Sequence, residues 1–165
     1  MEKRLRINLE KLPEEGTMQI SGELDPALFD LPKGDARPVG PLVYDLSVQL
    51  FGKELFVNGK ISASFEFTCV RTLNPFVKTI SLEDYASAFE VGDQLVVDIS
   101  EEIREELILA FPAYPKCDEG DEPKPCEINS SYLGVDKHPQ ERVNTSRTDG
   151  NAGVWDALDS LNPNS

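Results

Sequence analysis

Residues 42–68 read LVYDLSVQLFGKELFVNGKISASFEFT, and this stretch decides the fold class. In both halves apolar residues alternate with polar ones, as in strands that have one buried and one exposed face. Gly52-Lys53 separates the halves as one candidate turn. Asn58-Gly59 predicts a hairpin turn inside the second half, because type I′ turns need positive φ at both central residues. The stretch therefore predicts antiparallel β-sheet.

Shorter segments on either side of this stretch continue the strand pattern. Asp25 followed by Pro26 has the capping and first-turn residues of a short helix, so one or two helical turns are expected there. Glycine-containing turns punctuate the remaining sequence, which is typical of a meandering sheet. The further strands expected are residues 2–9, 17–24, 76–82, 86–91 and 94–98.

The principal helix is expected near 99–111. Ile99, Ile103 and Leu107 fall on one stripe, and Pro112 ends the segment. Either Asp98 or Ser100 could cap its first turn. The expected fold class is therefore α+β: a mainly antiparallel β-sheet, which could be barrel-like, with one helix lying across it.

Composition divides the chain near Cys117. Residues 1–117 carry the strand and helix patterns and predict a single β-rich domain. Residues 118–165 are acidic and polar, with few large apolar side chains to offset chain entropy, so a largely flexible tail is expected. Within that tail, residues 154–161 have the spacing of a short amphipathic helix that could dock on the domain or on a partner.

Net charge limits the partners that the chain can bind alone. The 165 residues include 16 basic and 30 acidic side chains, a formal charge of −14. Autonomous nucleic-acid binding usually needs a basic face, so this charge favours a basic protein partner. The sequence shows neither an apolar stretch long enough to span a membrane nor an apolar N-terminal signal, which predicts a cytoplasmic protein without membrane partners.

The residues that could perform chemistry are few. A zinc site built from Cys69, Cys117, Cys126 and His138 is conceivable, but it would need every candidate at once, so ordinary free thiols are the favoured interpretation. His138 is the only histidine. It lies in the polar tail, where a solvated side chain is expected rather than a catalytic Cys–His pair. Because no catalytic signature or phosphate loop is found, we expect no enzyme activity, no small-molecule substrate and no cofactor.

Two segments carry a family resemblance. The run Cys69-Val70-Arg71-Thr72-Leu73-Asn74-Pro75-Phe76 and the strand–helix segment 95–112 resemble the YceD family, bacterial and plastid proteins needed for large-subunit ribosomal RNA to accumulate. The family pattern is Cys-x-Arg-Cys-Leu, and Thr72 stands where its second cysteine normally lies.

The resemblance implies a non-enzymatic role in large-subunit ribosome biogenesis. The chain would support accumulation or processing of 23S ribosomal RNA by binding ribosomal RNA, a basic ribosomal protein or an assembly factor. The partner-binding residues that it implies are Cys69, Arg71, Leu73 and Arg104.

Other interpretations remain open from the sequence. The cysteines could form a metal- or redox-responsive module, or the chain could be an interaction module unrelated to ribosomes. Arg71 could serve only in a salt bridge to a nearby acid, and Arg104 is expected to pair with Glu101 or Glu105 on the helix.

Overall fold

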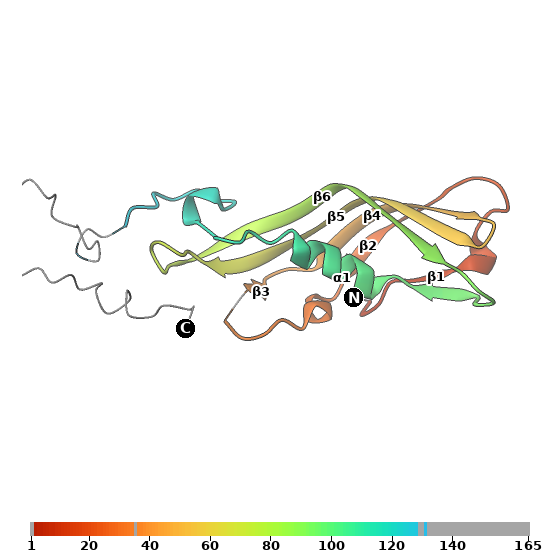
Figure 1. The fold of residues 1–165 in the computed structure, drawn as a ribbon, viewed down its shortest axis with the longest axis horizontal. Helices are drawn as coiled ribbons and strands as arrows, with labels where there is room; N and C mark the ends of the chain where they lie inside the picture. Colours follow the sequence, from red (N-terminus) through yellow and green to blue (C-terminus); the bar gives the residue numbers. More distant parts are fainter. Residues whose placement is uncertain (1, 35, 129–130, 132–165) are drawn as a thin grey trace, which may run out of the picture. The chain divides into compact units, whose positions relative to one another are not determined.

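The computed structural model describes residues 2–34, 36–128 and 131. The chain divides into two compact units, residues 1–130 and 131–165, and every helix and strand described here belongs to the first (Figure 1). Its eight principal elements are β1 (Arg6–Asn8), β2 (Met18–Leu24), β3 (Ala36–Pro38), β4 (Leu42–Phe51), β5 (Glu54–Thr68), β6 (Pro75–Glu90), β7 (Val96–Asp98) and α1 (Ser100–Leu109). Three 3₁₀ turns join them: η1 (Leu9–Lys11), η2 (Pro26–Phe29) and η3 (Cys117–Glu119).

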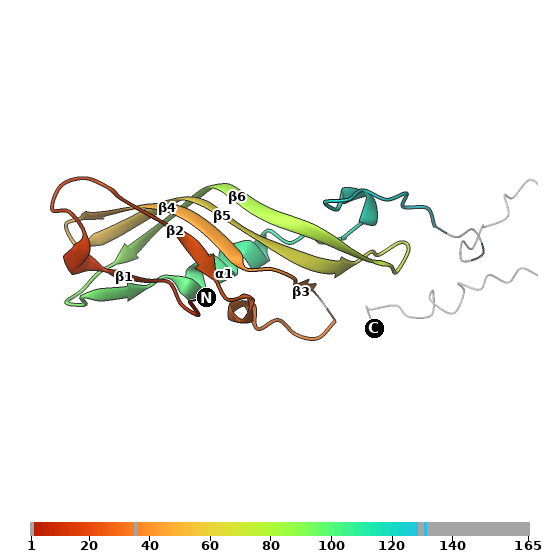
Figure 2. The ribbon, with the colours of Figure 1, turned by 180° about the vertical axis from the view of Figure 1, so that it is seen from behind.

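β5 lies at the centre of a five-stranded antiparallel sheet. β6 pairs with one edge of β5, while β4 and then β3 share the other edge, and β2 pairs with β4 (Figure 2). β1 and β7 form a separate antiparallel pair. The expected α+β class is confirmed, and in the part of the chain that the structure describes the sheets are not closed into a barrel.

The predicted hairpin turn at Asn58-Gly59 is wrong. β5 runs through these residues without a break, and the chain reverses at Gly52-Lys53 instead. At Gly59 the pairing with β6 shifts register, which makes a β-bulge, and φ is +148°. A Cβ atom there would meet the Asp45 carbonyl oxygen and lie 2.9 Å from the Leu46 Cα. The glycine is thus required by a bulge and a close backbone approach, which are the usual reasons for glycine inside a strand.

β6 is also longer than expected. The sequence predicted two short strands, 76–82 and 86–91, but the structure has one strand from Pro75 to Glu90. Its partner β5 offers hydrogen-bonding groups along its whole length, so the paired strand continues past the bulge. The β5–β6 hairpin therefore projects its closing turn well beyond the β2–β4 pairing (Figure 1).

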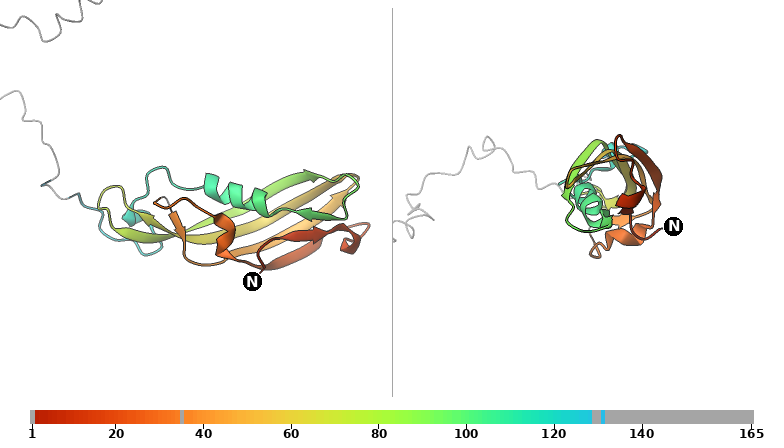
Figure 3. Two further views of the ribbon diagram at one scale, coloured as in Figure 1. Left: turned by 90° about the horizontal axis from the view of Figure 1, so that it is seen from below. Right: turned by 90° about the vertical axis from the view of Figure 1, so that its right-hand side faces the viewer.

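The principal helix is confirmed as α1, and it packs against β5, β6 and η2 (Figure 3). Ile103 and Leu107 are fully buried on its inner stripe. The carboxylate of Asp98 accepts a hydrogen bond from the Ser100 N–H at 3.1 Å. The Ser100 hydroxyl does not cap the helix, because it accepts the Leu5 N–H at 2.7 Å and thereby ties the β1 segment to the helix. No helix in the described residues is long and apolar enough to cross a membrane.

A row of phenylalanine rings fills the core beneath the outer end of β5. The Phe65 ring lies 4.7 Å from both the Phe29 and the Phe111 rings, measured between centroids. Phe67 continues the row, at 5.2 Å from Phe111 and 6.1 Å from Phe76. Edge-on contacts of this kind add to the free energy of burial, so the end of the hairpin has its own packed support.

Residues 118–128, assigned by composition to the tail, run beside the outer edge of β6. The Asp121 N–H donates to the Val77 carbonyl at 2.9 Å, and the Asp121 carboxylate accepts the Thr79 N–H at 2.8 Å and the Thr79 hydroxyl at 2.7 Å. These bonds cover an edge strand that would otherwise expose unpaired backbone groups. His138 and the short helix expected at 154–161 lie outside the described residues.

Gly59→Ala should destabilise the fold by more than about 2 kcal/mol, because a Cβ at that position collides with β4 backbone. Gly52→Ala is the matched control: φ is also positive there, at +64°, but nothing lies within 4 Å of the added carbon. That variant should lose only about 1 kcal/mol. Urea unfolding of both variants measures the difference, and equal losses would contradict the close-approach argument.

Candidate functional site

The three adjoining residues that the family resemblance selects lie in one turn, which joins β5 to β6. The Cys69 N–H donates to the Asn74 carbonyl and the Leu73 N–H donates to the Cys69 carbonyl, each at 2.9 Å, so the turn is closed at its base. A further bond, from the Val70 N–H to the Pro115 carbonyl at 2.9 Å, holds it against the segment that follows α1. We call residues 70–74 the exposed turn.

The exposed turn presents one cation among apolar side chains. Leu73 is 75% exposed and Val70 is 50% exposed, while Arg71 between them is also exposed. Arg71 forms no ion pair with any residue that the structure describes, so the salt bridge considered from the sequence is not found there. Leu73 has φ of +59°, a left-handed conformation that is costly for a leucine and persists only where surrounding bonds enforce it.

Three thiols converge behind this turn. Cys69 follows β5, Cys117 begins η3, and Cys126 lies in the segment that continues from it. Their sulfur atoms all lie within 4.8 Å of one another, and the Cys69 and Cys126 Sγ atoms are 3.5 Å apart. Cys69 and Cys117 are buried, while Cys126 is half-buried.

Thr72 is the polar neighbour of the cluster. Its N–H donates to the Cys69 Sγ at 3.5 Å, and its hydroxyl lies 3.7 Å from the Cys117 Sγ. Thr72 therefore contacts two of the three thiols. The sequence alone gave it no role, and the signal that could have found it is the Cys-x-x-Thr pattern from Cys69, because paired metal ligands commonly have two residues between them.

The surroundings of Cys69 and Cys126 shift the pKa values of their thiols in opposite directions. Burial alone raises the pKa of Cys69, but hydrogen bonds from the Thr72 hydroxyl and from the backbone of Thr72, Arg71 and Cys117 outweigh burial and lower that pKa to about 6. The pKa of Cys126 is raised, by burial first and then by its two thiol neighbours. A low-pKa thiol beside two others can bind a soft metal ion or take part in a disulfide.

Arg104 is not part of this site. Its Nε donates to the Phe29 carbonyl at 2.9 Å, and its Nη1 lies 2.7 Å from a Glu101 carboxylate oxygen, which is one of its two expected partners. These bonds join α1 to η2, so Arg104 stabilises the packing of the helix and lies apart from the exposed turn.

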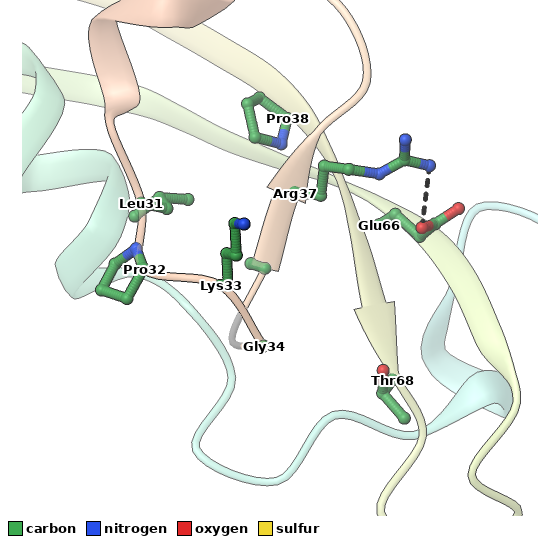
Figure 4. A pocket seen from close by; sticks show the side chains of 9 residues that line it. Leu31, Pro32, Lys33, Gly34, Arg37, Pro38, Glu66 and Thr68 are labelled. Atoms are coloured by element: carbon green, nitrogen blue, oxygen red, sulfur yellow. Dashed lines mark hydrogen bonds and ion pairs between the residues drawn. The ribbon is translucent and has the colours of Figure 1, made fainter.

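A hollow of about 360 Å³ lies beside β3 and the outer end of β5 (Figure 4). Leu31, Pro32 and Pro38 supply much of its apolar wall. At its rim Arg37 pairs with Glu66 at 2.9 Å, and this ion pair is open to solvent. The described residues that line the hollow include no buried ionisable side chain, so it lacks the converging polar groups of a binding or catalytic site.

Comparison of the chain with models of protein families, with curated proteins and with solved structures gave no match. The candidate site therefore stands on its own geometry: an exposed turn whose arginine has no ion-pair partner among the described residues, backed by three converging thiols.

Asp121→Ala should loosen the segment that carries Cys117 and Cys126, because it removes two hydrogen bonds to Thr79. Bonds to a carboxylate contribute about 1.5–3 kcal/mol each, so amide exchange in residues 75–82 should accelerate at least about tenfold. Hydrogen exchange followed by mass spectrometry measures this. Glu122→Ala, at the exposed neighbouring position, is the control and should leave exchange unchanged; equal rates in both variants would show that Asp121 does not hold the segment.

Proposed function

We propose that this chain is a non-enzymatic factor in large-subunit ribosome biogenesis, acting in the cytoplasm. It would support accumulation or processing of 23S ribosomal RNA by binding ribosomal RNA, a basic ribosomal protein or an assembly factor. The resemblance of residues 69–76 and 95–112 to the YceD family supports this proposal.

One observation carries the proposal: Cys69, Arg71 and Leu73, which the resemblance selects, lie in a single turn, the first buried at its base and the other two exposed. Cys69 is buried and anchors the base of the exposed turn, whereas Arg71 and Leu73 are presented to solvent. Neither exposed side chain has a structural role within the described residues that would account for it. Exposed side chains that are held in a fixed turn are suited to contact a partner.

The surroundings of Arg71 fit a macromolecular contact. Val70, Leu73 and Tyr114 expose 50%, 75% and 73% of their surfaces, and the Val70–Pro115 hydrogen bond brings the segment after Tyr114 beside the turn. Protein interfaces are enriched in arginine and in aromatic residues. A guanidinium with no ion-pair partner among the residues that the structure describes can bind a carboxylate or a phosphate through two parallel hydrogen bonds.

Charge favours a basic protein as the direct contact. A net charge of −14 repels a polyphosphate at long range and attracts a basic surface, which increases the rate of encounter. Arg71 would then bind an acidic group on that basic partner. Direct binding to ribosomal RNA would instead require Arg71 to act locally against an unfavourable overall field.

Cells depleted of the protein should show a lower ratio of large- to small-subunit ribosomal RNA, with precursor ends of the large-subunit species accumulating. The wild-type chain should restore the ratio, and the double variant Arg71→Ala, Leu73→Gly should not. Glycine is chosen for position 73 because it adopts φ of +59° without strain, so the turn keeps its shape while losing the side chain.

Leu109→Ala is the matched control, because Leu109 lies on α1 and is 79% exposed, close to the exposure of Leu73. It should restore the ratio as the wild type does. An unchanged ratio with normal precursors after depletion would overturn the ribosomal proposal. Full restoration by a folded double variant would leave the exposed turn without a role in it.

A further inference from the structure

We propose that Cys69, Cys117 and Cys126 bind one Zn²⁺ ion through their thiolates, with the fourth coordination position beside Thr72 left for an exchangeable ligand. This inference goes beyond the proposed function and does not depend on it, since it follows from the positions of the sulfur atoms alone.

The spacing of the sulfur atoms suits a single tetrahedral ion. Zinc binds thiolate sulfur at about 2.3 Å, so two thiolates on one tetrahedral ion lie about 3.8 Å apart. The Cys69–Cys126 separation of 3.5 Å and the outer limit of 4.8 Å for all three sulfur atoms bracket this value. Small movements of the side chains would place an ion at bonding distance from all three.

The groups around Cys69 favour the charged form of its thiol. Backbone N–H groups point at the sulfur of Cys69, one of them from Thr72 at 3.5 Å, and hydrogen bonds of this type orient and stabilise a metal-bound thiolate. Each thiol that coordinates the ion releases its proton to solvent.

The three thiols link the end of β5 to the segment that follows α1. Beyond α1, which ends at Leu109, the described chain forms one 3₁₀ turn, η3, before Cys126, and hydrogen bonds such as Asp121 N–H to the Val77 carbonyl and Lys124 N–H to the Cys117 carbonyl hold it in place. An ion shared by the end of β5, η3 and Cys126 would fasten this segment to the hairpin. Metal binding of this kind supplies folding free energy to segments that have little secondary structure.

Thiolate ligands select a soft or borderline ion and disfavour Mg²⁺ and Ca²⁺, which prefer oxygen. A disulfide between Cys69 and Cys126 would use two thiols and leave the buried Cys117 unexplained. Thr72 stands three residues after Cys69, at the position where a Cys-x-x-Cys pair would place its second thiol. Its hydroxyl is a weak zinc ligand, so the fourth position stays open to water or to a donor from another molecule.

The first test is metal content and cobalt substitution in the full-length, untagged, reduced protein. We expect about one zinc per chain by elemental analysis. Replacement by Co²⁺ should give intense visible bands and near-ultraviolet thiolate-to-metal charge-transfer bands. The Cys126→Ser variant should lose the part of the charge-transfer intensity that the Cys126 thiolate contributes. Protein that is folded by circular dichroism, yet takes up neither ion, would overturn the inference.

The second test adds a ligand where the chain lacks one. Thr72→Cys should close the site as four thiolates and raise the affinity for Zn²⁺ at least about tenfold in a competition with a chromophoric chelator. Thr72→Ser keeps the hydroxyl and is the matched control, with affinity close to the wild type. Equal affinity of the Cys and Ser variants, or a Cys69–Cys126 disulfide in freshly isolated protein, would overturn the proposed site. Ribosomal RNA levels do not enter either measurement, so this inference and the proposed function can fail separately.

Discussion

The pairing of β5 on both of its edges is the constraint on which the rest of the structure depends. β6 follows one edge from Glu54 to Thr68, while β4 and then β3 occupy the other. Every other strand of the main sheet is therefore placed by β5 directly or, for β2, through β4. The inner face of β5, which includes Leu55, Ile61 and Phe65, is fully buried and receives α1. A break in this strand would separate the helix-covered half of the sheet from the end that carries the site.

The length of β5 and β6 also explains where the site lies. Because the hairpin extends past β4, its closing turn has no neighbouring strand of its own and depends on other support. The phenylalanine row supplies part of that support from below, and residues 112–128 supply the rest from the side. The same segment brings Cys117 and Cys126 to Cys69, so the thiol cluster follows from the covering of a long hairpin's edge.

Alternation in residues 42–68 was enough to predict the sheet, and the stripe of Ile103 and Leu107 was enough to predict the helix. Both predictions succeeded because the spacing of apolar residues follows the face of the strand or helix that is buried. The Asn58-Gly59 turn was wrong because a local preference yielded to a tertiary contact with β4 that no local pattern reveals. The site was only partly visible. Cys117 and Cys126 are nine residues apart, a spacing that suggests no metal motif. The fold brings both to Cys69, and a hydrogen bond from the Lys124 N–H to the Cys117 carbonyl at 3.1 Å folds the segment between them back.

The exposed turn and the thiol cluster share one set of bonds, which links the two proposals physically without making either depend on the other. Cys69 closes the base of the turn through its backbone and joins the cluster through its sulfur, while Thr72 contacts two thiols from within the turn. A cation held by the thiolates would therefore restrict the residues that present Arg71 and Leu73. Ordering a contact surface before a partner arrives lowers the entropy cost of binding. The left-handed Leu73 is consistent with such a turn, because a strained leucine conformation persists only where its surroundings fix it.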